Sequence, residues 1–141
     1  MPIRFLIEKG VVFRELLGDV TFDALVKHWG EIFTNAELPD PFAIITDLRS
    51  CNLLINGKDV QRLVETIRPR MKGRRWISAA VVKSPVQFGV TRQFMTHASE
   101  FGENAVFYDF DEAVRWVREL IDDGAQIGSP KAPRLTNRLG R

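Results

Sequence analysis

Polar and charged side chains that could bind a ligand follow the apolar segments of this sequence. One apolar run ends in Asp47 and Arg49, another is followed by Lys83 and Ser84, and Asn56 precedes a helix-like pattern. In open α/β sheets, ligands bind beyond the carboxyl ends of the strands, where helix starts present free N–H groups. We therefore predict a ligand-binding rim at this edge of a sheet, formed by Asp47, Arg49, Asn56, Lys83 and Ser84.

Two other interpretations of these residues stay open. Asp47 and Arg49 could pair with each other, or with Lys83, which would make them structural residues. An enzyme that uses Asp47 with Lys83 or Arg49 is less favoured, because the sequence shows no nucleophile with a base beside it. We expect no catalytic residue.

Metal and cofactor chemistry have little support in the sequence. His28 and His97 lie in helix-like segments, with no cysteine or second histidine at ligand spacing. A glycine-rich phosphate loop is absent, since Asn56-Gly57-Lys58 is too short to form one. Cys51 is the single cysteine and cannot form an intrachain disulfide. We predict no metal and no cofactor, and we interpret Cys51 as an incidental small residue in a loop.

The composition is that of one soluble domain. The chain has 141 residues, 45% of them hydrophobic, and a net charge of +2. Residues 124–141 contain four basic residues and no acidic one, which leaves 16 basic against 18 acidic residues in the rest of the chain. A basic tail on a faintly acidic body is not by itself a nucleic-acid footprint. We find no secretory signal pattern and no apolar run long enough to span a bilayer. These features predict a cytoplasmic protein that binds no nucleic acid and does not insert stably into membranes.

The elements that must position the polar residues follow from hydrophobic spacing. Alternation over 3–8 and 11–17, with a turn at Gly10, predicts an edge hairpin in which Arg14 and Glu15 guard the edge. Helical and strand-like segments then alternate to the end of the domain. The expected helices cover about 22–33, 57–67, 85–101 and 109–121, and the expected strands 41–48, 76–83 and 105–108. Such alternation predicts an α/β fold with a mainly parallel sheet.

Three segments in this order resemble the SpoIIAA-like, or STAS-like, family of small bacterial proteins. They are 17–23, 44–49 and 106–116, the last with a capping pattern that begins at Asp109. The resemblance covers residues 3–123 and implies a mainly parallel sheet of about five strands, an N-terminal antiparallel edge hairpin and four helices. We therefore expect one STAS-like domain over 1–123 and an irregular basic tail over 124–141.

The resemblance also shapes the expected function. Anti-sigma-factor antagonists of this fold carry a phosphorylatable serine where the second helix begins, and Asn56 occupies that position here. We expect a non-enzymatic, regulatory module that binds a protein partner or a small ligand and lacks the phospho-serine switch. The relation of the family to CRAL-TRIO lipid-exchange domains implies an alternative, an intracellular carrier of an apolar or lipid-like ligand. We also expect a homodimer, formed by sheet faces that lack helices, with help from the basic tail.

Overall fold

A five-stranded sheet organises the protein. The computed structural model describes residues 3–123, so the predicted tail over 124–141 lies outside the described residues. The strands stand in sequential order: β1 (Ile3–Glu8), β2 (Val11–Thr21), β3 (Phe42–Leu54), β4 (Trp76–Val81) and β5 (Gly102–Phe107). β1 and β2 pair antiparallel, and all other neighbours are parallel. The predicted α/β class and N-terminal hairpin are confirmed.

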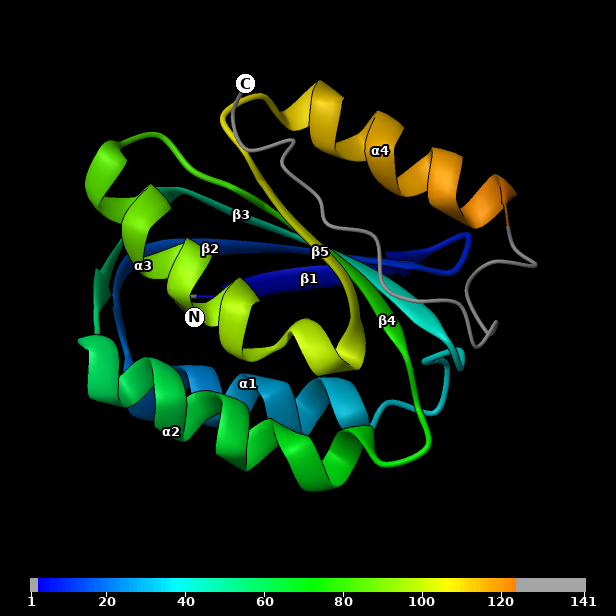
Figure 1. Ribbon diagram of the computed structural model, residues 1–141, viewed down its shortest axis with the longest axis horizontal. Helices are drawn as coiled ribbons and strands as arrows, with labels where there is room; N and C mark the ends of the chain where they lie inside the picture. The colour runs from blue at the N-terminus through cyan, green and yellow to red at the C-terminus, as the bar shows by residue number, and fades with distance from the viewer. Residues whose placement is uncertain (1–2, 124–141) are drawn as a thin grey trace.

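Within the described residues, three helices connect the parallel strands, a fourth follows β5, and together they lie on both sides of the sheet. Their bounds are α1 (Phe22–Phe33), α2 (Gly57–Ile67), α3 (Pro85–His97) and α4 (Phe110–Asp122), with short 3₁₀ turns at Arg68–Met71 and Ser99–Phe101. Of the described helices, Figure 1 shows α1, α2 and α3 on one side of the sheet and α4 on the other. The cover of the two faces is therefore unequal.

The unequal cover divides the core into two clusters. Alternate strand residues such as Ile44 and Val12 join α1, α2 and α3 in a large cluster. Their neighbours Ile45 and Val11 join α4 in a smaller one. The period of two along each strand produces this division, and apolar residues on both faces make β3 a buried central strand.

Local signals fix most element boundaries. Thr21 caps α1 by accepting a hydrogen bond from the N–H of Ala24 at 3.2 Å. Gly10 turns the hairpin with φ of 80°. Asp109 caps α4, but through the N–H of Asp111, so the reciprocal capping box expected at α4 is not formed. A capping box forms instead at α2, between Asn56 and Asp59.

The third strand is longer than expected. Residues 50–54, which we expected to form a loop, continue β3 to Leu54. This end of β3 pairs with β2 but extends beyond β4, whose pairing with β3 stops at Asp47 and Val81. The expectation was wrong because polar residues on a two-stranded extension meet solvent and resemble a loop.

Candidate functional site

Asp47 and Arg49 form an ion pair on the sheet face that carries α4. Arg49 donates from Nε to Oδ1 at 3.0 Å and from Nη2 to Oδ2 at 2.9 Å. Burial alone would raise the pKa of the Asp47 carboxyl, but the hydrogen bonds and the charge of Arg49 outweigh burial and lower it. A carboxylate with a lowered pKa is a weak general base. The mutual pairing offered as an alternative from the sequence is thus present.

The other predicted rim residues are Asn56, Ser84 and Lys83, which either accept hydrogen bonds from backbone N–H groups or face solvent. Asn56 accepts from the N–H of Asp59 at 3.0 Å, and Ser84 accepts from the N–H of Gln87 at 3.2 Å. Both side chains therefore cap helices, and the Lys83 side chain is exposed. Within residues 3–123, no hydrogen bond or ion pair links these three side chains to the Asp47–Arg49 pair.

Gln87 connects the extension of β3 to the start of α3. Its Nε2 donates to the carbonyl oxygens of Leu48 at 2.8 Å and Cys51 at 3.0 Å, and its Oε1 accepts from the N–H of Lys83 at 2.9 Å. A strand that has lost its neighbour exposes unpaired carbonyls. The amide of Gln87 takes the place of the missing strand.

Cys51 is buried in β3 and not in a loop as expected. Its Sγ donates to the carbonyl oxygen of Leu48 at 3.4 Å. Burial raises the pKa of this thiol to about 11, and the charge of Asp47 adds to the effect. A thiol with a raised pKa is a poor nucleophile.

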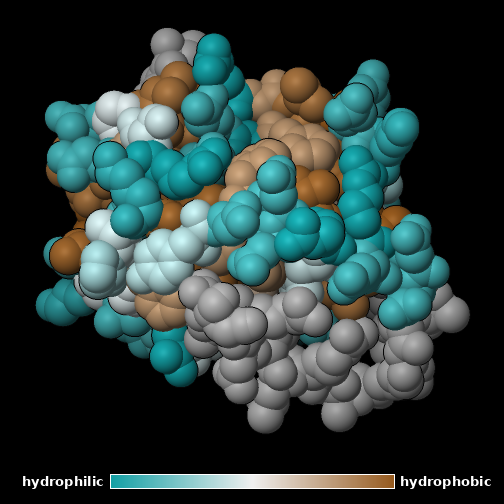
Figure 2. Space-filling view, turned by 90° about the horizontal axis from the view of Figure 1, so that it is seen from above, coloured by the Kyte–Doolittle hydropathy of each residue, from teal (hydrophilic) through white to brown (hydrophobic). Residues whose placement is uncertain are grey.

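The part of the sheet face beside α4 forms an open groove of about 490 Å³. Leu6 is 55% exposed, and Phe13 and Phe110 are half-buried. The groove also contains two ion pairs, Arg4 with Glu15 at 2.6 Å and Arg49 with Asp47. Figure 2 shows the molecule from the side of α4, with hydrophobic residues gathered among hydrophilic ones.

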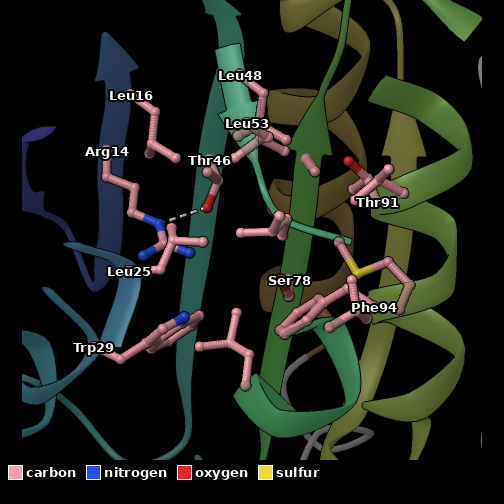
Figure 3. A pocket seen from close by; sticks show the side chains of 16 residues that line it. Arg14, Leu16, Leu25, Trp29, Thr46, Leu48, Leu53, Ser78, Thr91 and Phe94 are labelled. Atoms are coloured by element: carbon pink, nitrogen blue, oxygen red, sulfur yellow. Dashed lines mark hydrogen bonds between the residues drawn. The ribbon is translucent and has the colours of Figure 1, made fainter. Parts of the chain in front are cut away.

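The opposite sheet face contains a cavity of about 60 Å³. Most of its lining is apolar and comes from β2, β3, β4, α1, α2 and α3 (Figure 3). The polar exceptions are Arg14, Thr46, Ser78 and Thr91, with the indole of Trp29 at one end. A mainly apolar cavity with a few polar groups is the usual form of a small-molecule site.

Arg14 is the one charged residue in this lining, and it is only 8% exposed. Its Nε donates to Thr46 Oγ1 at 2.8 Å, and its guanidinium carbon lies 4.3 Å from the centroid of the Trp29 ring. No ion pair involves Arg14 within residues 3–123. Burial without a carboxylate lowers the pKa of Arg14 to about 9.

His28 completes the surroundings of Arg14. It is buried, and its Nδ1 lies 3.2 Å from Arg14 Nη1. Because the guanidinium can only donate, Nδ1 accepts and the neutral ring carries its proton on Nε2. Burial, and then the charge of Arg14, lower the pKa of His28 to about 4. The imidazole is therefore neutral at pH 7.

The prediction that Arg14 guards an exposed edge is wrong. β1 is the edge strand, and β2 lies inside the sheet. Alternation along β2 puts Arg14 on the same face as Val12 and Leu16, both fully buried. That spacing is the sequence signal which could have identified Arg14 as a cavity residue.

The arginine-rich end of α2 is an exposed structural region. Arg68 donates to Glu100 with Nη2–Oε2 at 2.9 Å, and Arg74 lies 3.7 Å from Asp40. In the part of the chain that the structure describes, no cluster of three or more metal-ligating side chains exists. None of the described helices is long and apolar enough to cross a membrane.

Comparison with known proteins identifies the fold. A solved structure from Shewanella loihica PV-4, described as an uncharacterized protein of the DUF3478 family with a SpoIIAA-like fold, aligns with a TM-score of 0.53 at 17% identity. The alignment covers 82% of this chain and 93% of that chain. No family model matches the sequence, and no curated protein matches it. The chain has a SpoIIAA-like α/β fold.

Proposed function

We propose that this protein is a non-enzymatic module that binds a small ligand between its sheet and helices α1, α2 and α3. The observation that carries the proposal is the cavity of about 60 Å³, which is apolar except for a few polar groups and is lined by the buried Arg14. Burying a cation is costly unless a compensating group is present. A residue of this kind in a cavity wall is better explained by a ligand than by stability.

The size of the cavity limits the ligand. A water molecule needs roughly 10–15 Å³ of such volume, so about 60 Å³ corresponds to roughly four to six water-sized positions. A carrier of long acyl chains would need a cavity of hundreds of cubic ångströms. The cavity therefore favours a ligand of a few non-hydrogen atoms over the lipid-like cargo.

Access to the cavity is easiest between the end of β3 and α3. The lining residues Leu53, Ile55, Val90 and Phe94 are half-buried, whereas Leu16 and Val60 at the other walls are fully buried. Only side-chain rearrangement at the half-buried side is needed to admit a small molecule. A ligand can thus exchange without unfolding the domain.

Nuclear magnetic resonance with matched cavity variants tests this function. A panel of small amphipathic molecules with about four to six non-hydrogen atoms should shift amide signals around the cavity. Ala80→Val adds two methyl groups to the cavity wall, and Ala79→Val adds the same groups on the face toward α4. We expect Ala80→Val to abolish binding and Ala79→Val to retain it. Equal binding by both variants, or shifts confined to the α4 face, would reject the internal site.

A second function, self-association, is favoured by the open groove beside α4. Leu6 is 55% exposed, and the same face carries two ion pairs, which give it both positive and negative groups. A surface that carries both signs can match a copy of itself across a two-fold axis. We propose that the homodimer forms through this groove; the contribution of the tail concerns residues outside the described part of the chain.

Sedimentation at several concentrations tests the dimer. We expect Leu6→Lys to weaken the association, because it places a charge in the centre of the contact. Leu54→Lys is the matched control, since Leu54 is 49% exposed and does not line the groove. A full-length chain that stays monomeric at about 100 μM, where weak interfaces still assemble, would refute the dimer.

A further inference from the structure

Arg14 has hydrogen-bond donors that the protein does not use. A guanidinium has five N–H groups, of which Nε serves Thr46 and one of Nη1 serves His28. The second N–H of Nη1 and both N–H groups of Nη2 have no hydrogen bond within residues 3–123. A carboxylate can accept two parallel hydrogen bonds from a guanidinium, one from Nη1 and one from Nη2.

Three other buried side-chain atoms also lack a hydrogen-bond partner. His28 Nε2, Trp29 Nε1 and Thr91 Oγ1 are buried side-chain atoms without a hydrogen-bond partner. The first two are donors, and the third is a hydroxyl that can donate. Figure 3 shows the indole nitrogen on the side of the ring nearest Arg14. Buried polar groups normally have partners, so the indole N–H of Trp29 beside Arg14 indicates that an acceptor belongs nearby; Thr91 lies across the cavity, and His28 does not line it.

The rest of the cavity lining determines the polarity and the size of the ligand beyond its charged group. Beyond Arg14 the lining is mainly apolar and includes Leu25, Leu63 and Met95. An apolar lining favours a hydrocarbon body, and a volume of about 60 Å³ limits that body to a few carbon atoms. Neutral molecules of this size would leave the guanidinium charge without a partner.

We propose that the ligand is a short-chain aliphatic monocarboxylate, of two to four carbons, whose carboxylate is bound by the Nη1 and Nη2 groups of Arg14. The proposal rests on the small-ligand function argued above and specifies the chemical class of the ligand. The aromatic face of Trp29 holds the guanidinium plane in place, and the hydroxyl of Thr46 fixes its rotation through Nε. Arg14 is thus oriented before the ligand arrives, which reduces the entropic cost of binding.

Isothermal titration of the full-length chain with propionate and propionamide tests the proposal. The two probes have the same number of non-hydrogen atoms and differ in charge. Propionate should bind wild type at least tenfold more tightly than propionamide, in titrations carried to about 50 mM and compared at equal ionic strength with sodium chloride. This comparison needs no variant and therefore does not depend on how a substitution affects folding.

Two arginine variants locate the site. Arg14→Met should weaken propionate binding at least tenfold, and Arg14→Lys should restore only part of it, because an ammonium lacks the bidentate geometry. Arg49→Met is the matched control, since Arg49 lies on the opposite face in an ion pair with Asp47, and it should leave binding unchanged. Circular dichroism checks that each variant is folded.

The outcomes separate the ligand class from the general function. Equal affinity for both probes, unaffected by Arg14→Met but lost in Ala80→Val, would overturn the carboxylate and retain the small-ligand function. Binding lost in Arg49→Met but kept in Arg14→Met would overturn the internal site. No binding of either probe, with no response of the cavity to the neutral panel, would overturn both proposals.

Discussion

The guanidinium carbon of Arg14 lies 4.3 Å from the centroid of the Trp29 ring, so the buried cation rests on an aromatic face and not beside a carboxylate. A cation over an indole gains about 0.5–2 kcal/mol, which is small beside the several kcal/mol that desolvation of a charge costs. The site is therefore arranged at the expense of stability, as functional sites commonly are.

Arg14→Met should stabilise the protein in the absence of ligand. Met replaces the charge with an apolar side chain of similar length, and the gain should be about 1–2 kcal/mol after Thr46 and His28 lose a partner. Urea unfolding at pH 7 measures it. Arg49→Met should not stabilise the protein, because it leaves the Asp47 carboxylate, whose side chain is 14% exposed, without its ion-pair partner. A clear loss of stability in Arg14→Met would show that the guanidinium's hydrogen bonds outweigh its desolvation.

His28 should make the protein less stable in mild acid. Burial and the charge of Arg14 lower the His28 pKa to about 4 in the folded state, below its ordinary value of 6.5. The unfolded chain therefore binds more protons between pH 6.5 and 4, and stability falls by up to about 3 kcal/mol across that window.

Comparing unfolding free energies of wild type and His28→Gln at pH 7 and pH 4.5 isolates this effect from the carboxylates that both chains share. His28→Gln should lose less stability than wild type on acidification. His97→Gln, which changes an exposed histidine, should behave like wild type. If His28→Gln is as sensitive to acid as wild type, the buried imidazole is not the group that titrates.

Gln87→Leu should destabilise the region where β3 extends beyond β4. The substitution leaves the carbonyls of Leu48 and Cys51 and the N–H of Lys83 without their partner. We expect a loss of about 2–3 kcal/mol in urea unfolding and faster hydrogen exchange at the Lys83 amide. Gln93→Leu changes an exposed glutamine and should have little effect. Equal stability of the two variants would mean that water replaces the Gln87 amide.

Cys51 should be unreactive in the folded protein. Burial raises its pKa to about 11, so almost no thiolate exists at pH 7.5. Iodoacetamide should leave the native chain unlabelled for hours and label it fully in guanidinium chloride, as intact mass spectrometry would report. Rapid labelling under native conditions would contradict the buried placement of the thiol.

The sequence predicted the order of elements because each one has a strong local pattern. Thr21, Gly10 and Asp109 mark boundaries through capping and turn preferences, and the structure places them at those boundaries. The SpoIIAA-like fold expected from three short segments is also the fold of the Shewanella structure.

The candidate site was much less accessible from sequence. Asn56 and Ser84 are good ligand residues in general, yet here they cap helices, which the sequence alone cannot distinguish from binding. Arg14 resembled an edge charge because its burial depends on which strand lies outside it and on the packing of α1. Those relations are tertiary: the alternation along β2 indicates the face that Arg14 shares with Val12 and Leu16, but not which helices and strands surround that face.

The groove beside α4 and the cavity on the opposite face both include residues of β2. Phe13 and Glu15 face the groove beside α4, while Arg14 between them faces the cavity. The pairing of β2 with β3 changes register directly after these residues, between Glu15 and Leu17. A displacement of this segment moves both surfaces at once. We therefore expect the two proposed events, occupancy of the cavity and association through the groove, to be linked by a coupling free energy, so that each alters the other by the same factor.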